Sequence, residues 1–553
     1  MSQDDPGRWD MEADIVVVGT GAAGSSAALF SHEDGARVIM LEKGRRYGGT
    51  TEKSGGILHM PNNSFMRDAG IKDERDDAIR YYARLAYPTL YNPNDSRFGL
   101  SEHQYSLIAA YYDNASATVD GLQKMGALDP TPWVEWDGKQ FFPDYFAHLP
   151  ENKAPRGRGL LAKDPTTGQA AGGVELIRQL KAAVDKREIP VLLRHRASRL
   201  VTNAQGEVIG IEATTDDEQT VAIRVRKGVI FGSGGFTQNP ELRLTFLRGP
   251  VYGGCAVPTN QGDLIYMATG LGAQLENMSN AWWAQAVLES VLVNPSPPTD
   301  IFAVPGDSMI QVNRYGRRVL DEKFVYNERT QVHFQWDPVK AEYTNLFMIM
   351  IYDGRTADIW GSLPGSLSTY PIPSKDAPES YVISGETLEG LTSAIEARLA
   401  AITDRTGGFA LDTAFAANLT ETVARFNQFA EQGADLDFHR GETPIELAFH
   451  GPAAPGNDKP NRTMYPLSAT GPYYGIILSG GTLDTKGGPK INDQAQILNT
   501  KDRPIPGLYG AGNCIGSPAG QAYWAGGGTI GPALTFGRIA AENATKEAPK
   551  DDE

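Results

Sequence analysis

Three glycines in a fixed spacing follow the first predicted strand of the chain. Residues 14–18, Asp-Ile-Val-Val-Val, form a β-branched run of the kind that fills buried strands. Gly19, Gly21 and Gly24 follow as a GxGxxG motif, and small apolar residues over 25–32 predict a helix. In this context the first glycine permits a tight turn, the second admits a pyrophosphate, and the third lets helix and strand pack closely. The pattern predicts a dinucleotide site at the amino end of that helix.

The sequence after this motif favours FAD over NAD as the dinucleotide. A second predicted strand, residues 36–41, ends at Glu42, which is placed to accept ribose hydroxyls. Residues 43–56 are rich in glycine and hydroxyl side chains, which suits a segment that wraps a pyrophosphate and reaches a flavin. Far downstream, residues 507–513 form a second glycine turn, and 526–536 open a helix whose amino end would stabilise a reduced, anionic flavin.

The predicted cofactor site draws on segments near both ends of the chain, so the two ends must meet to form it. Its predicted residues are Gly19, Gly21, Ala22, Ala23, Gly24, Glu42, Lys43, Gly49, Thr50, Thr51, Ser54, Gly55, Gly56, Ala197, Gly234, Gly512, Asn513 and Ile530.

Composition and pattern indicate a globular protein of several domains. Of its 553 residues, 41% are hydrophobic and 21% are charged. Glycine-rich strands at both ends, with amphipathic helices over 386–402 and 417–432 between them, predict one nucleotide-binding domain in two pieces and one inserted domain. We expect the FAD-binding domain over 1–278 and 463–553, and the inserted catalytic domain over 279–462. The fold class is therefore α/β plus α+β, with a Rossmann-like FAD-binding domain.

Charge, cysteine usage and hydropathy exclude several kinds of partner. The net charge of −16 would repel phosphate backbones, so we expect no nucleic acid. No stretch approaches 18 apolar residues, so we expect no membrane span. Two cysteines, Cys255 and Cys514, and an acidic start unlike a secretory signal predict a cytoplasmic protein. The eight histidines lack ligand spacing, so no metal site is predicted.

Motifs along nearly the whole chain resemble those of the fumarate reductase/3-ketosteroid dehydrogenase superfamily of FAD flavoproteins. They are GTGAAG from residue 19, GGTTEKSGGILHMPNN from 48, IFGSGGFTQNPELR from 230, NQGDLIYMATGLGA from 260, QVNRYGRRVLDE from 311, GLYGAGN from 507 and AYWAGGGTIGPALTFG from 522. The resemblance implies a Rossmann-like FAD domain that carries an inserted α+β catalytic domain, with the active site between them. Relatives with covalent flavin have a histidine before Ser-Gly-Gly, where this chain has Lys53, which implies non-covalent FAD.

Within that superfamily the chain is most similar to the Δ1-type 3-ketosteroid dehydrogenase branch, and a cyclohexanone-type ketone dehydrogenase is a further possibility. Tyr326 follows the GRRVLDE motif, where these dehydrogenases place their catalytic base, and Arg329 is close by. Tyr523 and the Gly527 amide match the groups that hold the substrate ketone, and Tyr145 matches a supporting tyrosine. Tryptophans of the chain would line an apolar substrate pocket or belong to the core, namely Trp282, Trp283, Trp336 and Trp360.

The resemblance implies desaturation next to a cyclic ketone, either a 3-ketosteroid or a smaller cyclohexanone-like ring. Tyr326 would take the α proton, the β hydrogen would leave as hydride to the flavin N5, and an external acceptor such as a quinone would receive the electrons. A tyrosine pKa of about 10 makes ionisation at neutral pH cost about 4 kcal/mol. Tyr145 or Arg329 would have to lower that cost. Two alternatives stay open, a fumarate-type reductase with an arginine proton donor and a flavin-binding electron carrier without chemistry of its own.

Overall fold

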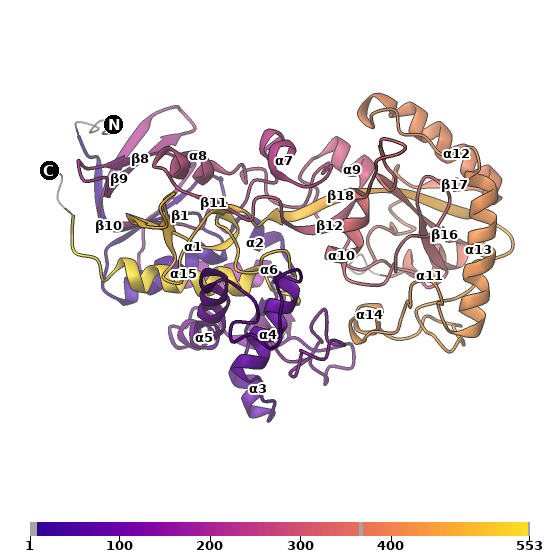
Figure 1. Ribbon diagram of the computed structural model, residues 1–553, viewed down its shortest axis with the longest axis horizontal. Helices are drawn as coiled ribbons and strands as arrows, with labels where there is room; N and C mark the ends of the chain where they lie inside the picture. Colours follow the sequence, from indigo (N-terminus) through magenta and orange to yellow (C-terminus); the bar gives the residue numbers. More distant parts are fainter. Residues whose placement is uncertain (1–7, 364–368, 551–553) are drawn as a thin grey trace.

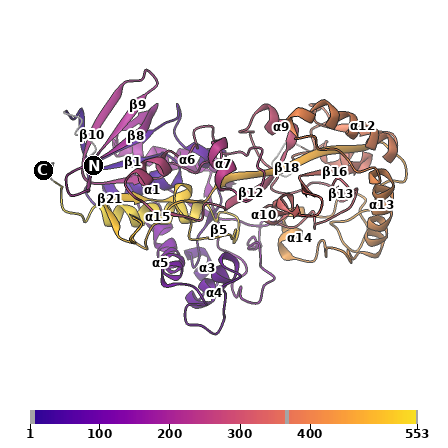
Figure 2. The same ribbon diagram turned by 45° about the horizontal axis from the view of Figure 1, so that its top comes forward.

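Two lobes lie side by side, each built around its own β-sheet (Figures 1 and 2). The computed structural model describes residues 8–363 and 369–550. Both ends of the described chain lie in the first lobe, and strands β12 and β18 lead from it into the second (Figure 1). Helices α3, α4 and α5 project from the first lobe on one side (Figure 1). The predicted cofactor segments from the two ends of the chain therefore share one lobe.

The first lobe is built around an eight-stranded, mainly parallel sheet. Its path is β20 (Gln496–Leu498), β21 (Pro504–Gly510), β10 (Thr220–Phe231), β1 (Met11–Val18), β2 (Val38–Glu42) and β7 (Val191–Leu193), with β9 (Val208–Thr215) and β8 (His195–Thr202) extending β10. Strands β21, β10, β1, β2 and β7 pair in parallel. Parallel sheets are covered on both faces, which explains the continuous apolar run in β1.

The predicted βαβ unit at the start of the chain is confirmed. Strand β1 is longer than the predicted 14–18, because Met11 to Ala13 already pair with β10. Helix α1 (Ala22–Glu33) begins within the glycine motif, and β2 ends at Glu42 as expected. The carboxyl ends of β1 and β2 therefore lie beside the amino end of α1, the arrangement that the GxGxxG pattern predicts.

The second lobe is built around a five-stranded antiparallel sheet. Its strands are β12 (Ala281–Val287), β18 (Tyr473–Thr485), β16 (Phe347–Asp353) and β13 (Met309–Val312), with β17 (Ile383–Gly385) beside β18. Helices α12 (Leu388–Ala401) and α13 (Phe415–Gln432) confirm the two predicted amphipathic helices. Their apolar faces share a core with β13, β16 and β18. The carboxyl end of α13 is a left-handed glycine, Gly433, with φ of 76°.

The division of the chain into three segments stays a proposal. Strand β18 follows the expected boundary at residue 463, and it pairs with β16 along its first half and with β12 along its second half. By sheet membership, residues 473–485 thus belong with the second lobe, and the chain rejoins the first sheet at β20. A glycine-rich apolar run does not reveal which of two sheets it joins, because both sheets bury such strands.

The remaining elements surround the two sheets. In the first lobe they are α2 (Gly49–Lys53), β3 (Leu58–His59), α3 (Ser64–Asp68), α4 (Arg75–Ala86), α5 (Glu102–Lys124), β4 (Pro130–Pro132), β5 (Gly159–Lys163), β6 (Ala170–Ala171), α6 (Gly173–Lys186), α7 (Pro240–Phe246), α8 (Asp263–Gly270), β11 (Leu275–Glu276), β19 (Gly488–Pro489) and α15 (Ile530–Ala544). In the second they are α9 (Leu288–Val293), α10 (Tyr326–Thr330), β14 (Trp336–Asp337), β15 (Glu342–Tyr343), α11 (Gly354–Trp360) and α14 (Pro444–His450). Single 3₁₀ turns are Gln331–Phe334, Thr403–Arg405 and Gly512–Cys514.

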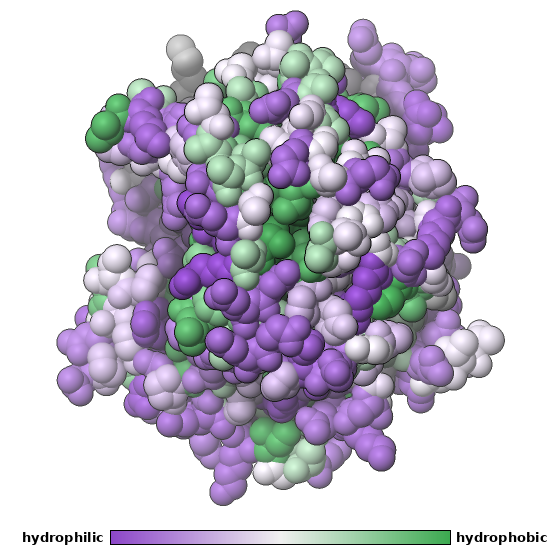
Figure 3. Space-filling view, turned by 90° about the vertical axis from the view of Figure 1, so that its right-hand side faces the viewer, coloured by the Kyte–Doolittle hydropathy of each residue, from purple (hydrophilic) through white to green (hydrophobic). Residues whose placement is uncertain are grey.

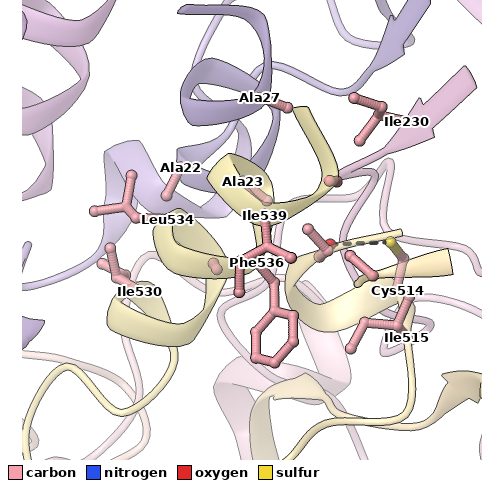
Figure 4. Close-up of a cluster of buried hydrophobic side chains, with 14 of the residues drawn as sticks. Ala22, Ala23, Ala27, Ile230, Cys514, Ile515, Ile530, Leu534, Phe536 and Ile539 are labelled. Carbon is pink, nitrogen blue, oxygen red and sulfur yellow. Dashed lines mark hydrogen bonds between the residues drawn. The ribbon is translucent and has the colours of Figure 1, made fainter. Parts of the chain in front are cut away.

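Helices α1 and α15 cross closely beneath the first sheet, although more than 490 residues separate them in sequence (Figure 4). Small residues make the approach possible, since a Cβ at Gly537 would lie only 2.5 Å from the Ala23 carbonyl oxygen. The Ser26 hydroxyl donates to the Leu534 carbonyl oxygen at 2.7 Å. Leu534, Phe536 and Ile539 extend this apolar cluster (Figure 4). The last helix thus fixes the start of α1, where the dinucleotide is predicted to bind.

The face over the second lobe is mostly hydrophilic, with hydrophobic side chains scattered among charged ones (Figure 3). Within residues 8–363 and 369–550, no helix has the length and apolar character needed to cross a membrane. The same residues contain no group of three or more histidine, cysteine, aspartate or glutamate side chains arranged to hold a metal ion.

Candidate functional site

One deep cavity of about 570 Å³ is lined by residues from both lobes. It brings together segments that are far apart in the sequence, as the prediction required. Of the predicted cofactor residues, the lining includes Gly19, Gly21, Ala22, Ala23, Glu42, Lys43, Gly49, Thr50, Thr51, Ser54, Gly55, Gly56, Ala197, Gly234, Gly512, Asn513 and Ile530. Gly24 does not line the cavity; it lies beneath it, in the contact between α1 and β1. The predicted Tyr145, Tyr326, Tyr523 and Gly527 line the same cavity.

Two positions of the turn at the end of β1, Gly19 and Gly24, have to be glycine. Gly19 has φ of +101°, and a Cβ there would collide with the carbonyl group of Gly232. A Cβ at Gly24 would collide with the Gly19 carbonyl oxygen. A Cβ at Gly21 would meet nothing closer than the Thr51 hydroxyl at 3.3 Å, so space above this residue opens into the cavity. The turn is thus shaped to receive a pyrophosphate beside the first amides of α1.

Glu42 is held firmly at the end of β2. Its Oε2 accepts hydrogen bonds from the Thr20 amide at 3.1 Å and the Thr20 hydroxyl at 2.6 Å, and its Oε1 accepts from the Gly44 amide at 2.7 Å. Lys43 beside it donates to Gln261 and Asp263, both at 2.8 Å, so its ammonium is already paired. A fixed carboxylate at this place suits the ribose hydroxyls of a dinucleotide.

A buried carboxylate that the sequence reading did not single out also lines the cavity. Asp484 accepts hydrogen bonds from the Gly235 amide at 2.9 Å, the Asn260 amide at 2.7 Å, the Asn513 amide at 3.1 Å and the Thr237 hydroxyl at 3.1 Å. Burial raises the pKa of this carboxyl group. The sequence does hold a signal for this residue, because Asp484 is the one acidic residue in the apolar, glycine-rich strand β18. Asp484 thus ties together three segments around the cofactor end of the cavity.

Three tyrosines meet at the other end of the cavity. The ring centroids of Tyr145 and Tyr523 are 5.2 Å apart, those of Tyr326 and Tyr523 5.4 Å, and those of Tyr145 and Tyr326 5.5 Å. The hydroxyls of Tyr145 and Tyr326 are hydrogen-bonded to each other. Each side chain is at most 3% exposed and yet lines the cavity. Tyr326 begins α10 in the second lobe, whereas the other two belong to loops of the first, so the lobes must meet to form the cluster.

Backbone hydrogen bonds connect the loops that carry two of these tyrosines. The Trp524 carbonyl oxygen accepts from the Tyr145 amide at 3.1 Å and from the Tyr81 hydroxyl at 2.8 Å. Gly527, with φ of +84°, lies against the strand β3, where a Cβ would be 2.5 Å from the His59 amide nitrogen. Residue 527 therefore has to be glycine, and the loop from Tyr523 to Gly527 is held in one place.

A buried ion-pair network supports the Tyr145 loop from behind. Arg158 donates to both oxygens of Asp73, at 2.6 and 2.9 Å, and also to Asp144, the residue before Tyr145. All three charged side chains are buried. Burial raises the pKa of Asp144 to about 6, while Arg158 opposes that rise. If the loop moved away, Asp144 would separate from Arg158 and leave a buried charge without its partner, which is costly. The network therefore keeps the Tyr145 loop in place.

Burial raises the pKa of all three tyrosines. For Tyr326 desolvation is the largest cause, and the neighbouring hydroxyls of Tyr145 and Tyr523 raise its pKa further. Desolvation likewise raises the pKa of Tyr145 and of Tyr523, although the hydrogen bond with Tyr326 lowers that of Tyr523. The expected lowering of the Tyr326 pKa by Tyr145 is therefore not found, because the two hydroxyls are buried neutral groups that share one hydrogen bond.

Arg329 lies behind the cavity wall. Its guanidinium donates to the carbonyl oxygens of Phe324, of Ile301 at 3.0 Å and of Phe302 at 3.4 Å. Desolvation lowers the pKa of Arg329 to about 10. Phe302 lines the cavity, with its ring edge-on to Tyr326 at 5.3 Å, so Arg329 supports the wall. In the two described ranges, no arginine lines the cavity.

The wall around the tyrosines is aromatic. Of the four tryptophans considered from the sequence, Trp282 lines the cavity and packs edge-on to Tyr523 at 4.8 Å, whereas Trp283, Trp336 and Trp360 do not line it. The sequence reading missed five aromatic residues around the tyrosines, Trp133, Trp136, Phe142, Phe302 and Phe449. The first three belong to residues 133–146, which hold six aromatic side chains, a density that would have drawn attention to this loop.

Comparison with known proteins agrees with this geometry. Residues 14–530 match a family model described as an FAD binding domain. A 3-oxosteroid 1-dehydrogenase from Mycolicibacterium smegmatis is 31% identical, over 96% of this chain and 96% of that protein. A 4-oxocyclohexanecarboxylate 2-dehydrogenase from Sinomonas cyclohexanicum is 29% identical, over 97% of this chain and 93% of that one.

A solved structure has the same fold over nearly the whole chain. It is a 3-ketosteroid delta1-dehydrogenase from Sterolibacterium denitrificans in complex with 1,4-androstadiene-3,17-dione, with a TM-score of 0.79 and 26% identity. The match covers 97% of this chain and 99% of that one. The resemblance inferred from the motifs and the predicted fold class are thereby confirmed. Since the family model spans most of the sequence, the chain belongs to the FAD binding domain family and is an FAD-dependent oxidoreductase.

Proposed function

We propose that this protein is an FAD-dependent dehydrogenase that introduces a C=C bond next to the carbonyl group of a cyclic ketone. The observation that carries the proposal is the cluster of Tyr145, Tyr326 and Tyr523 in the cavity that the cofactor segments also line. Relatives named for a 3-oxosteroid and for 4-oxocyclohexanecarboxylate, both cyclic ketones, support it.

The cofactor end of the cavity fits FAD. The glycine turn at Gly19, the fixed carboxylate of Glu42, the hydroxyl-rich residues 49–56 and the turn at Gly512 would hold its phosphates, ribose and flavin. When bound, FAD would supply the acceptor for the hydride that leaves the substrate. Lys53 supports non-covalent binding, because its ammonium donates to the Pro297 carbonyl oxygen at 3.0 Å and occupies the place of the histidine of covalent relatives.

The tyrosines would divide the acid and base roles between them. The Tyr523 hydroxyl and the Gly527 amide would donate hydrogen bonds to the ketone oxygen, stabilise negative charge there and so acidify the α carbon. Tyr326 would then accept the α proton. Tyr145 is hydrogen-bonded to Tyr326 and would hold its hydroxyl in place beside Tyr523. The Trp524 carbonyl ties the backbone of Tyr145 to the loop of Tyr523, so the groups keep their spacing.

A reductase of the fumarate type is less well supported. That chemistry needs an arginine in the cavity as proton donor, and Arg329 is instead engaged by three backbone carbonyls behind the wall. An electron carrier without its own chemistry would not need a solvent-shielded tyrosine cluster beside the cofactor segments. We further propose that a quinone or similar external acceptor receives the electrons. A cytoplasmic location is also proposed, which the free, buried Cys255 and Cys514 support.

The test is anaerobic mixing of the yellow holoprotein with a 3-ketosteroid, with cyclohexanone and, after dithionite reduction, with fumarate. We expect a ketone to bleach the flavin absorbance and mass spectrometry to find a product two hydrogens lighter. Reoxidation by fumarate alone would contradict the proposal, and so would absence of bleaching across a panel of cyclic ketones of increasing size.

A further inference from the structure

The cavity continues outward from the tyrosines between two segments, one from each lobe. Residues 133–142 connect β4 with the Tyr145 loop, and Ala448 and Phe449 lie in the last turn of α14 on the opposite side. Phe449 lies 5.9 Å from the Tyr145 ring and 5.4 Å from the Phe142 ring, and Phe142 stacks on Trp133 at 3.7 Å. A row of aromatic rings thus leads away from the reacting end.

Trp136 is the outermost member of this wall. Its side chain lines the cavity although the residue is 63% exposed, whereas Phe142 is 7% exposed and Tyr145 1%. Exposure therefore rises along the row from the tyrosines to the mouth. The Trp136 indole is open to water on one side and faces an apolar cavity on the other. Covering a large aromatic surface removes apolar area from water, so a ligand that contacts this ring gains binding free energy.

The position of the Trp136 ring is fixed from the opposite lobe. Its Nε1 donates to the Ala448 carbonyl oxygen at 2.8 Å, in α14. Gly451, just after that helix, packs under the ring, and a Cβ built there would crowd the same Nε1 at 3.0 Å. This contact between the lobes holds the ring across the mouth of the cavity.

The charged side chains that line the cavity near its mouth already have partners within the protein. Glu135 lines it, and its carboxylate accepts a hydrogen bond from Arg156, which also donates to the Phe141 carbonyl oxygen at 2.7 Å. The lysines of the lining, Lys43 and Lys53, follow Glu42 in the cofactor segment and already donate to other groups. The part of a ligand that reaches Trp136 is thus expected to be uncharged and apolar.

We propose that Trp136 is a specificity-determining residue that binds the end of the ketone remote from its carbonyl group. With the ketone oxygen at Tyr523, a single ring would stay among the tyrosines and Phe449. A skeleton of several fused rings would extend along the aromatic row and cover the indole. The inference rests on the proposed function, which places the ketone oxygen at Tyr523. It adds that Trp136 discriminates between substrates by their length.

The test compares Trp136→Ala with the wild-type holoprotein on uncharged ketones of increasing length: cyclohexanone, 2-decalone and a four-ring 3-ketosteroid. Dissociation constants come from the change in flavin absorbance, and KM and kcat from turnover with an artificial acceptor. We expect about a tenfold weaker Kd and higher KM for the four-ring ketone, from loss of several tens of Å² of apolar contact. For cyclohexanone the constants should change less than twofold. Equal changes for all lengths, or no change for the longest, would overturn the proposal.

Two further variants separate a specific contact from a general disturbance. Trp136→Phe keeps apolar ring surface and loses the bond to Ala448, so affinity for the long ketone should stay within about threefold. If Trp136→Phe loses as much affinity as Trp136→Ala, ring contact is not the cause. Trp336→Ala removes an indole that is 52% exposed and outside the cavity, and it should change nothing. Ketones that bind without bleaching the flavin would contradict the proposed function while the affinities still test Trp136. A wild type that binds no ketone would overturn both.

Discussion

The two ends of the cavity are built in different ways. The cofactor end is made of backbone, small residues and hydroxyls at the carboxyl ends of parallel strands, where Gly19 and Gly24 leave no room for a Cβ. The tyrosine end is made of large side chains that both lobes contribute, from loops of the first lobe and from α10 of the second. A backbone cradle serves any dinucleotide, because it binds phosphate and ribose, whereas side chains from two lobes can be changed one at a time. Binding of the cofactor and choice of chemistry are therefore separable here.

The sharpest way to break this comparison is to remove the proposed base and look at both ends. Tyr326→Phe keeps the ring and deletes only the hydroxyl that is bonded to Tyr145. We expect flavin reduction by a ketone to slow by about 10³-fold, the usual scale for loss of a general base, with FAD content unchanged. Stopped-flow absorbance at the flavin band measures the rate of flavin reduction, and the absorbance spectrum of the purified protein measures its FAD content.

Tyr266→Phe is the matched control, since that residue lies half exposed on α8 and outside the cavity. It should react at the wild-type rate. A Tyr326→Phe variant that turned over ketone at a similar rate would remove residue 326 from the chemistry, and loss of FAD from it would mean that the two ends are coupled.

A substitution in the glycine turn should affect the cofactor end alone. Gly19→Ala places a Cβ against the Gly232 carbonyl in a backbone with φ of +101°. A left-handed backbone costs a non-glycine residue about 1–2 kcal/mol, and the overlap adds about 1–3 kcal/mol, so FAD affinity should fall by about 10²-fold. Fluorescence of released flavin on dilution measures the dissociation constant.

Gly206→Ala separates strain from collision. Gly206 has φ of +80°, but a Cβ there would meet no atom within 4 Å, and the residue is outside the cavity. It should cost some stability and leave FAD affinity unchanged. Equal loss of FAD from both variants would show that general backbone strain, not the shape of the Gly19 turn, explains the effect.

The pH dependence of flavin reduction sharpens the account of the tyrosine end. Because burial raises the pKa of Tyr326 above the usual value of about 10, the residue stays neutral through the accessible range. Below that pKa the phenolate fraction grows tenfold for each pH unit, so the reduction rate should rise about tenfold per unit from pH 7 to 10 without a plateau. Anaerobic stopped-flow traces at each pH give the rate.

The Tyr326→Phe variant supplies the control for that profile, because its residual rate should not follow the same slope. A flat wild-type profile for the chemical step would contradict a tyrosine base. A plateau near neutral pH would mean that bound substrate and cofactor lower the pKa of the cluster far below its value in the free protein.

The difference between the two ends also explains what the sequence could predict. The GxGxxG turn, Glu42 and residues 49–56 were found from local spacing, because backbone geometry dictates glycine at fixed positions. Tyr326 and Tyr523 could be predicted only from the resemblance to a known family, because no local sequence pattern distinguishes a catalytic tyrosine from a packed one. Trp136 and Phe449 were missed because only the packing of one lobe against the other places them in the same cavity. The boundary proposed at residue 463 does not settle which sheet β18 joins, because an apolar run suits either sheet.

Asp484 lies at the cofactor end, and contacts through Asn513 and Trp282 connect it to the tyrosine end, so its replacement should give the smallest effect. Its two oxygens accept from five donors, the Thr485 amide included. One of those donors, Asn513, also accepts from Trp282 at 2.9 Å, and Trp282 packs on Tyr523. Asp484→Asn would turn one oxygen into a donor that faces other donors, at a cost of about 1–3 kcal/mol. We expect roughly tenfold weaker FAD binding, a lower melting temperature and a modest loss of ketone affinity. Asp502→Asn, at an exposed ion pair with Lys490, should leave all three unchanged. Weaker FAD binding with unaltered ketone affinity would mean that Asp484 serves the cofactor end only, and that the chain through Asn513 and Trp282 carries nothing to Tyr523.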